Sequence, residues 1–448
     1  MTQSSPPGGW LFGNFRPFRR NPLGYLQMCA RDYGDVVPLR FGSRRIVLIS
    51  DPRLIAEVLV AQHRIFRKHF ALRMARPALG DGLLTSDGAS WLQHRQIMQP
   101  AFRSERIAAY APIMAEHTRT QIGRWRDGMT IDVHQQMMEL TARIVTHCLF
   151  GADLGSSGQD VHSAMEILTD SFKSRLDTAF RLPLFLPTPG NLRFRRGMTR
   201  IDSVLGRIIA ERRRGQPQAD LLGALLTATT PDGVPVMGDR EIRDEVATLF
   251  VAGHETTANA LTWTQWLLAS HPGIQARLEE EVDRVCMGRP PSVAEVPCLT
   301  LCRYVIEESM RLMPPAWIIG REALSPVSIG GLLIARGTTV LMSQWVVHHD
   351  PRWFAQPERF DPDRWANGFA DRLADFAYFP FGGGARTCIG AGFARMEMVL
   401  LLASMVARFR LSLAPDALIE PVPTITLRPR YGMPMIVHSR TPCETMPV

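Results

Sequence analysis

The arrangement of hydrophobic and polar residues predicts a protein made mostly of helices. Apolar side chains recur every three or four residues through most of the stretch from Ala89 to about Leu299, which is the spacing of residues on one face of a helix. The clearest case is Asp239 to Ser270, where Ile242 and Val246 share such a face before His271-Pro272-Gly273 ends the pattern. We predict one long helix over residues 239–270, long enough to cross a domain.

Two regions with shorter apolar runs predict a small amount of β structure. Val36 to Phe41 and Arg45 to Ile49 flank the turn residues Gly42-Ser43 and predict a hairpin. Later in the chain, Val327 to Leu333 and Thr338 to Met342 predict two short strands. The sequence therefore indicates a mainly α protein with a small β region.

Length and composition fit a globular protein with a large core. The chain has 448 residues, of which 46% are hydrophobic and 21% charged, a balance unlike that of disordered or collagen-like chains. No apolar run reaches the ~18 to 20 residues that span a bilayer, and the start lacks the pattern of a secretory signal. We expect a cytoplasmic single domain over 1–448, with a leader at 1–20 and the β region near 34–50 and 318–345.

The charged residues do not point to a nucleic-acid protein. The net charge is +8, and nearly all the basic residues are arginines. Such a balance suits nucleic acid, an anionic membrane surface or an acidic protein partner. The arginine clusters at 193–196 and 212–214 are short and lie within amphipathic sequence, which favours solvated helix faces. The seven cysteines form neither a disulfide framework nor a paired CxxC zinc site.

One cysteine has neighbours that favour a reactive thiolate. Cys388 lies in the glycine-rich run Phe381-Gly-Gly-Gly384-Ala-Arg386-Thr-Cys388-Ile-Gly390, just before a predicted helix from about Ile389 to Phe409. Free N–H groups at a helix start favour a thiolate over a thiol, and glycines permit a close backbone approach. An arbitrary cysteine is usually a buried, inert thiol. A single thiolate is too few ligands for a closed zinc site, but it suits the axial position of a haem iron.

This run resembles the FxxGxRxCxG signature of the cytochrome P-450 superfamily of haem-thiolate monooxygenases, and it matches every fixed position. The resemblance implies that Cys388 ligates the iron of haem b and that Phe381, Arg386 and Gly390 belong to the haem-binding loop at 379–390. It also implies the cytochrome P-450 fold, a triangular helical domain. In that fold the haem lies between the long central helix and the helix after the cysteine.

Two further segments resemble structural landmarks of the family. Glu308-Ser-Met-Arg311 matches its ExxR motif, and Arg359 in Pro357-Glu-Arg359-Phe360 is expected to complete an ion-paired triad with these two residues. The triad would hold the core and take no part in the chemistry. Without the family order, Glu308 and Arg311 would be read as a solvated pair worth a few tenths of a kcal/mol.

Donors to the haem propionates are implied at three more places. Trp91-Leu-Gln-His-Arg95 resembles the family's WxxxR helix, in which Trp91 and Arg95 would hydrogen-bond a propionate. Arg386 and Arg321 would be the other donors, although Arg321 is equally well explained as an exposed arginine. Partly buried carboxylates need such charged donors for compensation.

The long helix carries a segment that resembles the family's oxygen-activation motif, Ala252-Gly253-His254-Glu255-Thr256-Thr257. Gly253 would loosen helix packing at the haem face and leave room for dioxygen and water. Thr256 would donate a hydrogen bond to the oxygen being activated, while Glu255 would relay protons from solvent. The alternative is a polar helix face. His254 begins an incomplete HExxH pattern, so we assign it no metal ligation.

The implied activity is insertion of one oxygen atom from O2 into a small molecule. The chain has no dinucleotide-binding GxGxxG sequence and no attached flavin or iron–sulfur region. Electrons are therefore expected from separate proteins, a ferredoxin and an NAD(P)H-dependent ferredoxin reductase. An acidic ferredoxin docking near Cys388 would account for part of the positive charge. We expect a monomer, and no nucleic-acid partner or membrane span.

The substrate-facing segments implied by the resemblance are mostly apolar, which favours a lipophilic substrate. They are Phe70 to Leu84, Ser171 to Asn191, Leu249 to Thr257, Pro314 to Ile319 and Arg430 to Met433. Arg73 or Arg76 would bind a charged head group if either turned inward. Terpenoid, fatty-acyl and polyketide-like substrates remain open, with a weak likeness to fatty-acid hydroxylases and pentalenene-type terpene oxygenases. The alternatives are peroxygenase, isomerase or coupling chemistry on the same fold, or a non-catalytic haem sensor.

Overall fold

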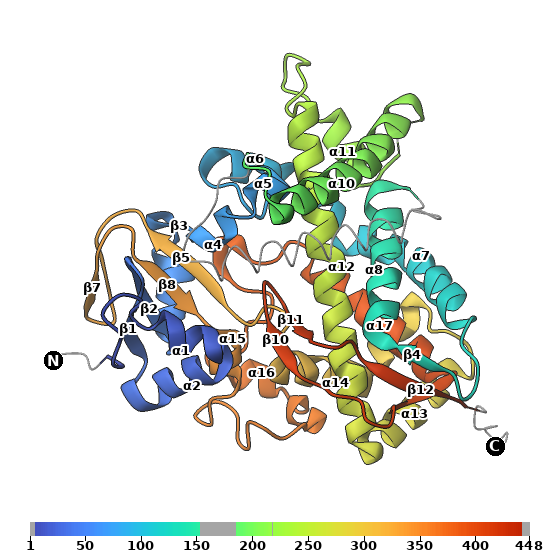
Figure 1. The fold of residues 1–448 in the computed structure, drawn as a ribbon. Helices are drawn as coiled ribbons and strands as arrows, with labels where there is room; N and C mark the ends of the chain where they lie inside the picture. Colours follow the sequence, from blue (N-terminus) through green and yellow to red (C-terminus); the bar gives the residue numbers. More distant parts are fainter. Residues whose placement is uncertain (1–4, 153–184, 217, 441–448) are drawn as a thin grey trace. The chain divides into compact units, whose positions relative to one another are not determined.

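The computed structural model describes residues 5–152, 185–216 and 218–440 (Figure 1). Its elements form two compact units. The first unit contains Met1–Met74, Glu307–Cys388 and Pro423–Leu427. The second unit contains Ala75–Ile306, Ile389–Val422 and Arg428–Val448. Each unit is therefore built from segments that are far apart in the sequence.

The first unit is organised around a five-stranded sheet with the order β1-β2-β8-β5-β3 (Figure 1). Its strands are β1 (Val36–Phe41), β2 (Arg44–Ile49), β3 (Phe66–Lys68), β5 (Ile319–Ala323) and β8 (Thr339–Met342). β1 and β2 form the predicted hairpin, and the turn holds Gly42 at a φ of 61°, which favours glycine. β2 and β8 run parallel, whereas β5 is antiparallel to both β8 and β3.

The first unit also contains short helices. They are α1 (Phe15–Arg20), α2 (Pro22–Tyr33), α3 (Pro52–Ala56), α4 (Phe70–Arg73), α15 (Gln344–His348) and α16 (Phe369–Arg372). α2 begins as its sequence predicts, because the Asn21 side chain accepts a hydrogen bond from Gly24 N–H and Pro22 occupies the first turn. Residues 1–20 thus include a helix within the segment expected to be a leader.

The segment Val327 to Leu333 differs from its prediction. It forms a hairpin of β6 (Val327–Ile329) and β7 (Leu332–Ile334) instead of a single strand. Gly330 and Gly331 have φ values of 55° and 78°, a left-handed pair that makes a tight turn between two strands. The two glycines were the signal that the prediction missed.

The second unit is mainly helical, and α12 (Asp239–Ser270) has the bounds that the sequence predicts (Figure 1). The other helices are α5 (Arg76–Leu79), α6 (Gly88–Met98), α7 (Ser104–Ile122), α8 (Val133–Phe150), α10 (Pro189–Arg214), α11 (Leu221–Thr227), α13 (Pro272–Cys286) and α17 (Ala391–Val406), while α14 (Thr300–Leu312) has residues in both units. α8 lies along α12, where Thr141 Oγ1 donates to the carbonyl of His254 at 3.0 Å.

The chain after Cys388 forms α17, whose middle is almost entirely buried. Its predicted span, 389–409, is longer at both ends because Gly390 is the N-cap and the strand β9 (Phe409–Leu413) begins soon after the helix. β9 pairs with β12 (Pro434–Ser439), which also pairs with β4 (Thr130–Asp132). Two short strands, β10 (Pro421–Pro423) and β11 (Leu427–Pro429), lie between β9 and β12 in the sequence. Within residues 5–152, 185–216 and 218–440, no helix combines the length and the hydropathy of a membrane span.

Candidate active site

The cysteine loop presents Cys388 on an ordered turn. Cys388 N–H donates to the carbonyl of Phe381 at 2.9 Å, and Thr387 Oγ1 donates to the carbonyl of Gly384 at 2.8 Å. Gly384 has a φ of 66°, and a Cβ at this position would overlap the carbonyl oxygen of Leu59. The Cys388 side chain is exposed. The glycine is thus required for the shape of the loop that carries Cys388.

Most of the other described cysteines are unsuited to ligation. Cys29, Cys148, Cys286 and Cys302 are buried. Burial raises the pKa of Cys29 and of Cys286 to about 11, and it also raises the pKa of Cys148 and that of Cys302. Their thiols stay protonated near neutral pH. Among the residues that the structure describes, Cys298 is the other exposed cysteine, and it has no glycine loop around it.

The ExxR motif forms a fully buried ion pair, but its third member is Arg364. Arg311 donates to both carboxylate oxygens of Glu308 at 2.9 Å, and neither side chain is accessible to solvent. Arg364 Nε and Trp365 Nε1 also donate to this carboxylate, at 3.3 Å and 3.0 Å. The prediction that the Arg359 side chain completes the ion-paired triad is therefore wrong. Arg359 contributes its backbone carbonyl to Arg311 instead.

The reason for this difference lies in the turn that carries Arg359. Arg359 N–H donates to the carbonyl of Gln356, and its guanidinium reaches back to the Gln356 side chain at the surface. The chain then enters a short 3-10 helix, Pro362–Trp365, which brings Arg364 and Trp365 to Glu308. The motif thus holds together a buried polar network in the first unit.

The predicted propionate donors Trp91 and Arg95 lie one turn apart on α6, with the guanidinium carbon 5.7 Å from the centre of the indole ring. Between them, His94 is buried and its Nδ1 lies 2.6 Å from Glu245 Oε1 on α12. The hydrogen bond with Glu245 raises the pKa of His94. This pair was missed by the sequence analysis, although Glu245 follows Ile242 by three residues on the apolar face of the long helix.

The loop before α6 is held against α12 by backbone contacts. Asp81 N–H donates to Asp244 Oδ2 and Leu83 N–H donates to Glu245 Oε2, both at 2.9 Å. Any side chain at Gly80 would overlap the Asp244 carboxylate, and one at Gly82 would overlap Thr248. Part of the predicted substrate-facing segment 70–84 therefore lies directly on α12, about two to three turns before Thr256.

Within α12, the predicted oxygen-activation residues are distributed around the helix. Ala252 is exposed, Gly253 and Thr256 are partly exposed, and Glu255 is buried. Thr256 Oγ1 donates to the carbonyl of Ala252 at 2.8 Å. His254 is buried and its Nδ1 bonds to the Phe250 carbonyl at 2.5 Å, so it belongs to the packed interior.

Gly253 does not loosen the packing of α12. A Cβ at this position would lie 3.0 Å from Cγ2 of Val145 on α8, which is tighter than ordinary van der Waals contact. The glycine therefore allows α8 and α12 to approach closely on this side. The expectation of looser packing at Gly253 is wrong for this contact.

The remaining predicted site residues lie in the first unit, apart from Gly390, which caps α17. Phe381 and Arg386 are in the cysteine loop, and Arg386 ends a 3-10 turn, Gly384–Arg386. Arg321 lies on β5 with a largely buried side chain, so it is not the exposed arginine of the alternative interpretation. The structure thus collects Cys388, Phe381, Arg386 and Arg321 in one unit.

Neither arginine near the predicted substrate segment is available for a charged head group. Arg73 donates to Glu322 Oε2 and to the carbonyl of Lys68, both at 2.6 Å. Arg76 pairs with Asp81 at 2.9 Å and donates to the carbonyl of Thr85 at 3.2 Å. Residues 171–184 of the predicted substrate-facing segment 171–191 lie outside the described residues.

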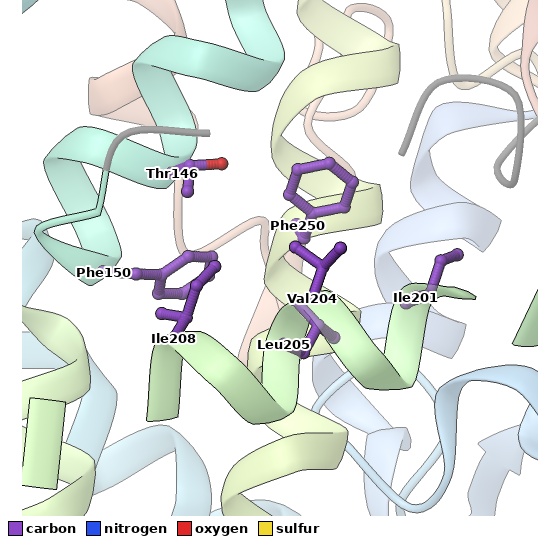
Figure 2. Close-up of a pocket in the computed structure, with 7 residues that line it drawn as sticks. All are labelled: Thr146, Phe150, Ile201, Val204, Leu205, Ile208 and Phe250. Atoms are coloured by element: carbon purple, nitrogen blue, oxygen red, sulfur yellow. The ribbon is translucent and has the colours of Figure 1, made fainter. Parts of the chain in front are cut away.

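A small apolar pocket lies between α8, α10 and α12 (Figure 2). Its lining consists of Thr146, Phe150, Ile201, Val204, Leu205, Ile208 and Phe250. At ~100° per residue, Phe250 and Ala252 point to opposite sides of α12. The pocket is therefore separate from the site on which the sequence analysis centred.

Comparisons with known proteins agree with the fold. The family model named Cytochrome P450 matches residues 4–433. Cyclooctatin synthase from Streptomyces melanosporofaciens is 36% identical over 427 residues, which cover 94% of this chain and 92% of that protein. Pentalenene oxygenase from Streptomyces avermitilis is 34% identical over 435 residues, covering 96% of each chain. A crystal structure of the cytochrome P450DA heme domain superposes with a TM-score of 0.88 at 28% identity, covering 98% of each chain.

Fold, motifs and relatives together define an oxidoreductase of the monooxygenase class. The chain belongs to the cytochrome P450 family, and the mainly helical fold is the one expected. Membership of this family implies a haem held through a thiolate.

Proposed function

We propose that this enzyme inserts one oxygen atom from O2 into a lipophilic small molecule of the terpenoid class, with haem b bound through Cys388. The observation that carries the proposal is the exposed Cys388 thiol on a loop that only glycine at 384 permits. In the same unit, Arg321 and Arg386 are suited to hold the haem carboxylates. When bound, the haem would supply the reductive activation of dioxygen.

The chain's own residues would then manage protons and water. Thr256 would turn its hydroxyl from the Ala252 carbonyl and would donate a hydrogen bond from Oγ1 at the place where dioxygen is used. Buried Glu255, the neighbouring residue, would pass protons inward to Thr256 Oγ1. The close packing of the loop 80–83 on α12 supports a site from which bulk water is excluded.

The terpenoid class is supported by the relatives and by the charges near the site. The similar proteins include a pentalenene oxygenase and a cyclooctat-9-en-7-ol 5-monooxygenase from Streptomyces melanosporofaciens, which is 36% identical over 428 residues. Arg73 and Arg76 are both paired with carboxylates of the chain. A fatty acid would need a cation for its head group, so a neutral hydrocarbon or alcohol fits better.

Electrons would come from a separate ferredoxin and its NAD(P)H-dependent reductase. The net charge of +8 favours an acidic partner. We propose that the ferredoxin binds near the cysteine loop, which would shorten the path of the electron to the iron.

A carbon monoxide difference spectrum of the reduced protein tests the haem-thiolate assignment. We expect a Soret band red-shifted in the manner of thiolate ligation, and its loss in Cys388→Ser. Cys298→Ser is the matched control, because Cys298 is also exposed. If Cys388→Ser kept the band, another ligand would hold the iron.

Product analysis with a surrogate ferredoxin, its reductase and NADPH tests the reaction. Sesquiterpene and diterpene hydrocarbons that shift the haem spectrum should yield oxygenated products, with one oxygen atom from labelled O2 in each. NADPH use without any product from a panel of such compounds, or product without O2, would favour the sensor, peroxygenase or isomerase alternatives.

A further inference from the structure

Trp10 and Leu11 are exposed at the tip of an ordered turn in the first unit. Trp10 is 92% exposed and Leu11 is 60% exposed. Gly9 and Gly13 flank the turn and pair as in an antiparallel ladder, with Gly9 N–H donating to the Gly13 carbonyl at 3.0 Å and Gly13 N–H donating to the Gly9 carbonyl at 2.8 Å. The backbone that carries the two apolar side chains is therefore held on both sides.

β1 anchors this turn through Arg40. The Arg40 guanidinium donates to the carbonyls of Gly9 and Trp10 at 2.8 Å and 2.7 Å. A Cβ at Gly13, whose φ is 58°, would overlap the carbonyl oxygen of Arg40, so this close approach needs glycine. The exposure of Trp10 and Leu11 is thus a feature of a defined structure and does not result from a loose chain end.

Exposed arginines lie on the elements next to this turn. α1 begins directly after Asn14, and the β1–β2 turn contacts the residues around Trp10 because Gly42 N–H donates to the carbonyl of Phe12 at 3.1 Å. The exposed arginines are Arg16, Arg19 and Arg20 on α1 and Arg44 and Arg45 on β2. The apolar tip is therefore bordered by positive charge on two elements.

The segments that form this surface carry no negative side chain. Residues 9–20 and 40–45, which we call the N-terminal patch, contain no aspartate or glutamate. The two acidic residues between these segments already pair with arginines, since Asp32 lies 2.7 Å from Arg31 and Asp35 lies 2.6 Å from Arg352. The patch therefore combines exposed apolar side chains with a net positive charge, which suits an anionic and amphipathic surface.

We propose that the N-terminal patch binds the surface of an anionic phospholipid bilayer, with Trp10 and Leu11 in the interfacial layer and the arginines on the lipid phosphates. Tryptophan favours this layer because its ring is apolar and its N–H is polar. The stem of an arginine lies along apolar surface while its guanidinium binds phosphate. Such binding holds the protein on the membrane surface and needs no spanning helix.

A bilayer suits this patch better than an acidic protein does. A stable protein interface needs ~800 Å² from each partner and a matching shape, whereas the N-terminal patch offers its apolar area at the tip of one turn. A fluid bilayer accepts such a tip without a preformed pocket and brings anionic head groups to each arginine. The inference uses neither the haem nor the substrate, so it is independent of the proposed function.

Flotation of the purified holoenzyme with lipid vesicles tests the binding. One set of vesicles contains phosphatidylcholine alone, and the other also contains phosphatidylglycerol at ~30% of the lipid. In ~0.1 M salt we expect at least ~10-fold stronger binding to the anionic vesicles, because the arginines gain only where the surface is negative. Raising the salt to ~0.5 M should release most of the bound protein, since the charges are then screened.

Two triple variants with the same change in net charge test the arginines. The patch variant combines Arg16→Gln, Arg19→Gln and Arg20→Gln. It should bind the anionic vesicles at least ~10-fold more weakly than the wild type. The control variant changes three exposed arginines of α10 and combines Arg193→Gln, Arg195→Gln and Arg196→Gln. It should bind within ~2-fold of the wild type, because these side chains lie outside the patch.

Single substitutions test the apolar tip. Leu11→Ala should weaken binding at least ~3-fold, whereas Leu418→Ala should not, although Leu418 is 71% exposed. Trp10→Phe keeps an apolar ring and should still bind. The wild type should show a blue shift of tryptophan emission on the anionic vesicles, and Trp10→Phe should lack it. The chain has nine tryptophans, so the difference between the two proteins assigns this signal to Trp10.

Three results would overturn the inference, each obtained with variants that melt at the wild-type temperature. The first is no binding of the wild type to the anionic vesicles, which would leave an acidic protein as the partner of these arginines. The second is an equal loss of binding in the two triple variants, which would make the attraction a matter of net charge alone. The third is an unchanged blue shift in Trp10→Phe, which would place the contact elsewhere. None of these results would affect the haem-thiolate assignment.

Discussion

Glu245 on α12 accepts a hydrogen bond from Nδ1 of His94 on α6 at 2.6 Å, and both side chains are buried. The second oxygen of the same carboxylate accepts Leu83 N–H at 2.9 Å. One carboxylate therefore fixes two neighbours of the long helix. These are the helix that carries Trp91 and Arg95, and the loop that precedes it.

This pair predicts a stability that depends on pH. The hydrogen bond with Glu245 raises the pKa of His94 above 6.5. A histidine with a raised folded pKa contributes its full stability below the unfolded pKa and loses it as the pH rises through the folded value. Glu245→Gln should thus lower the melting temperature more at pH 6 than at pH 9, with a loss of ~1.5 to 3 kcal/mol at the lower pH.

Glu241→Gln is the control for this experiment. Glu241 lies 3.9 Å from Nε2 of the same histidine, but its side chain is 51% exposed. An exposed pair of this kind contributes less than ~1 kcal/mol. If Glu245→Gln cost the same at pH 6 and pH 9, the charge of His94 would not be involved.

The buried carboxylate of Glu308 predicts unequal effects for two nearby arginines. Arg364→Ala removes a side-chain donor to Glu308, whereas Arg359→Ala leaves the backbone carbonyl that Arg311 uses. We expect Glu308→Ala to cost ~3 to 5 kcal/mol and to yield little holoprotein. Arg364→Ala should have the next largest effect and Arg359→Ala less than ~0.5 kcal/mol.

Thermal melts and the haem content of the purified variants measure this order. Full haem content and an unchanged melting temperature in Glu308→Ala would contradict the structural role of the network. A larger effect of Arg359→Ala than of Arg364→Ala would restore the assignment made from the sequence.

Replacement of the buried Glu397 on α17 by glutamine is expected to stabilise the protein. Its side chain is fully buried, and both carboxylate oxygens are without hydrogen-bond partners within the described ranges. Burial raises the pKa of Glu397 well above 4.5, so ionisation of the unfolded chain above pH 4.5 disfavours folding. Glu397→Gln should raise the melting temperature at pH 7. Each pKa unit is worth ~1.4 kcal/mol, roughly 2 to 4 °C in a domain of 150 to 250 residues.

The pH dependence of this stabilisation distinguishes removal of a buried ionisable group from a change in side-chain packing. The advantage of Glu397→Gln should vanish below about pH 4.5, where the glutamate is neutral in both states. Glu281→Gln should instead destabilise, because Glu281 accepts the N–H groups of Leu301 and Cys302 at 2.7 Å and 2.8 Å. A Glu397→Gln variant that melts lower at pH 7 would show that the carboxylate has a partner.

The sequence predicted elements well where strong local signals bounded them. α12 has the predicted bounds because an apolar stripe runs to His271-Pro272-Gly273. The hairpin of β6 and β7 was missed because the run Val327 to Leu333 is apolar on both sides of Gly330-Gly331. A local pattern thus predicts the end of a helix more reliably than it predicts a turn within an apolar run.

Residue roles that depend on tertiary contacts were harder to predict. Arg359 and Arg364 follow the same proline-rich turn, and only the fold determines which guanidinium reaches Glu308. Gly253 was assigned to open space, whereas its neighbour is Val145, 108 positions earlier in the chain. Cys388, by contrast, was singled out from its own loop, since the glycines that shape that loop are adjacent in sequence.

Replacement of Thr256 is expected to impair the productive use of oxygen without preventing haem binding. Its hydroxyl donates to the carbonyl of Ala252 at 2.8 Å, a bond that a single rotation about χ1 can exchange for one to a bound oxygen. Thr256→Ala should still bind haem and substrate. It should consume NADPH while releasing hydrogen peroxide, with product formation lower by ~10²-fold or more.

Thr257 provides the matched control, because it makes the same kind of bond from the next position along the helix, ~100° around its axis. Its Oγ1 donates to the carbonyl of Gly253 at 3.1 Å, and its side chain is only 2% exposed. Thr257→Ala should therefore change stability slightly and leave the ratio of product to peroxide unchanged. Thr256→Ser retains the hydroxyl and should retain coupling. Product and peroxide are measured in parallel for all four proteins with one turned-over terpenoid. Equal coupling in wild type and Thr256→Ala would reduce Thr256 to a helix-face residue, because a hydroxyl needed for proton delivery cannot be removed without loss of product.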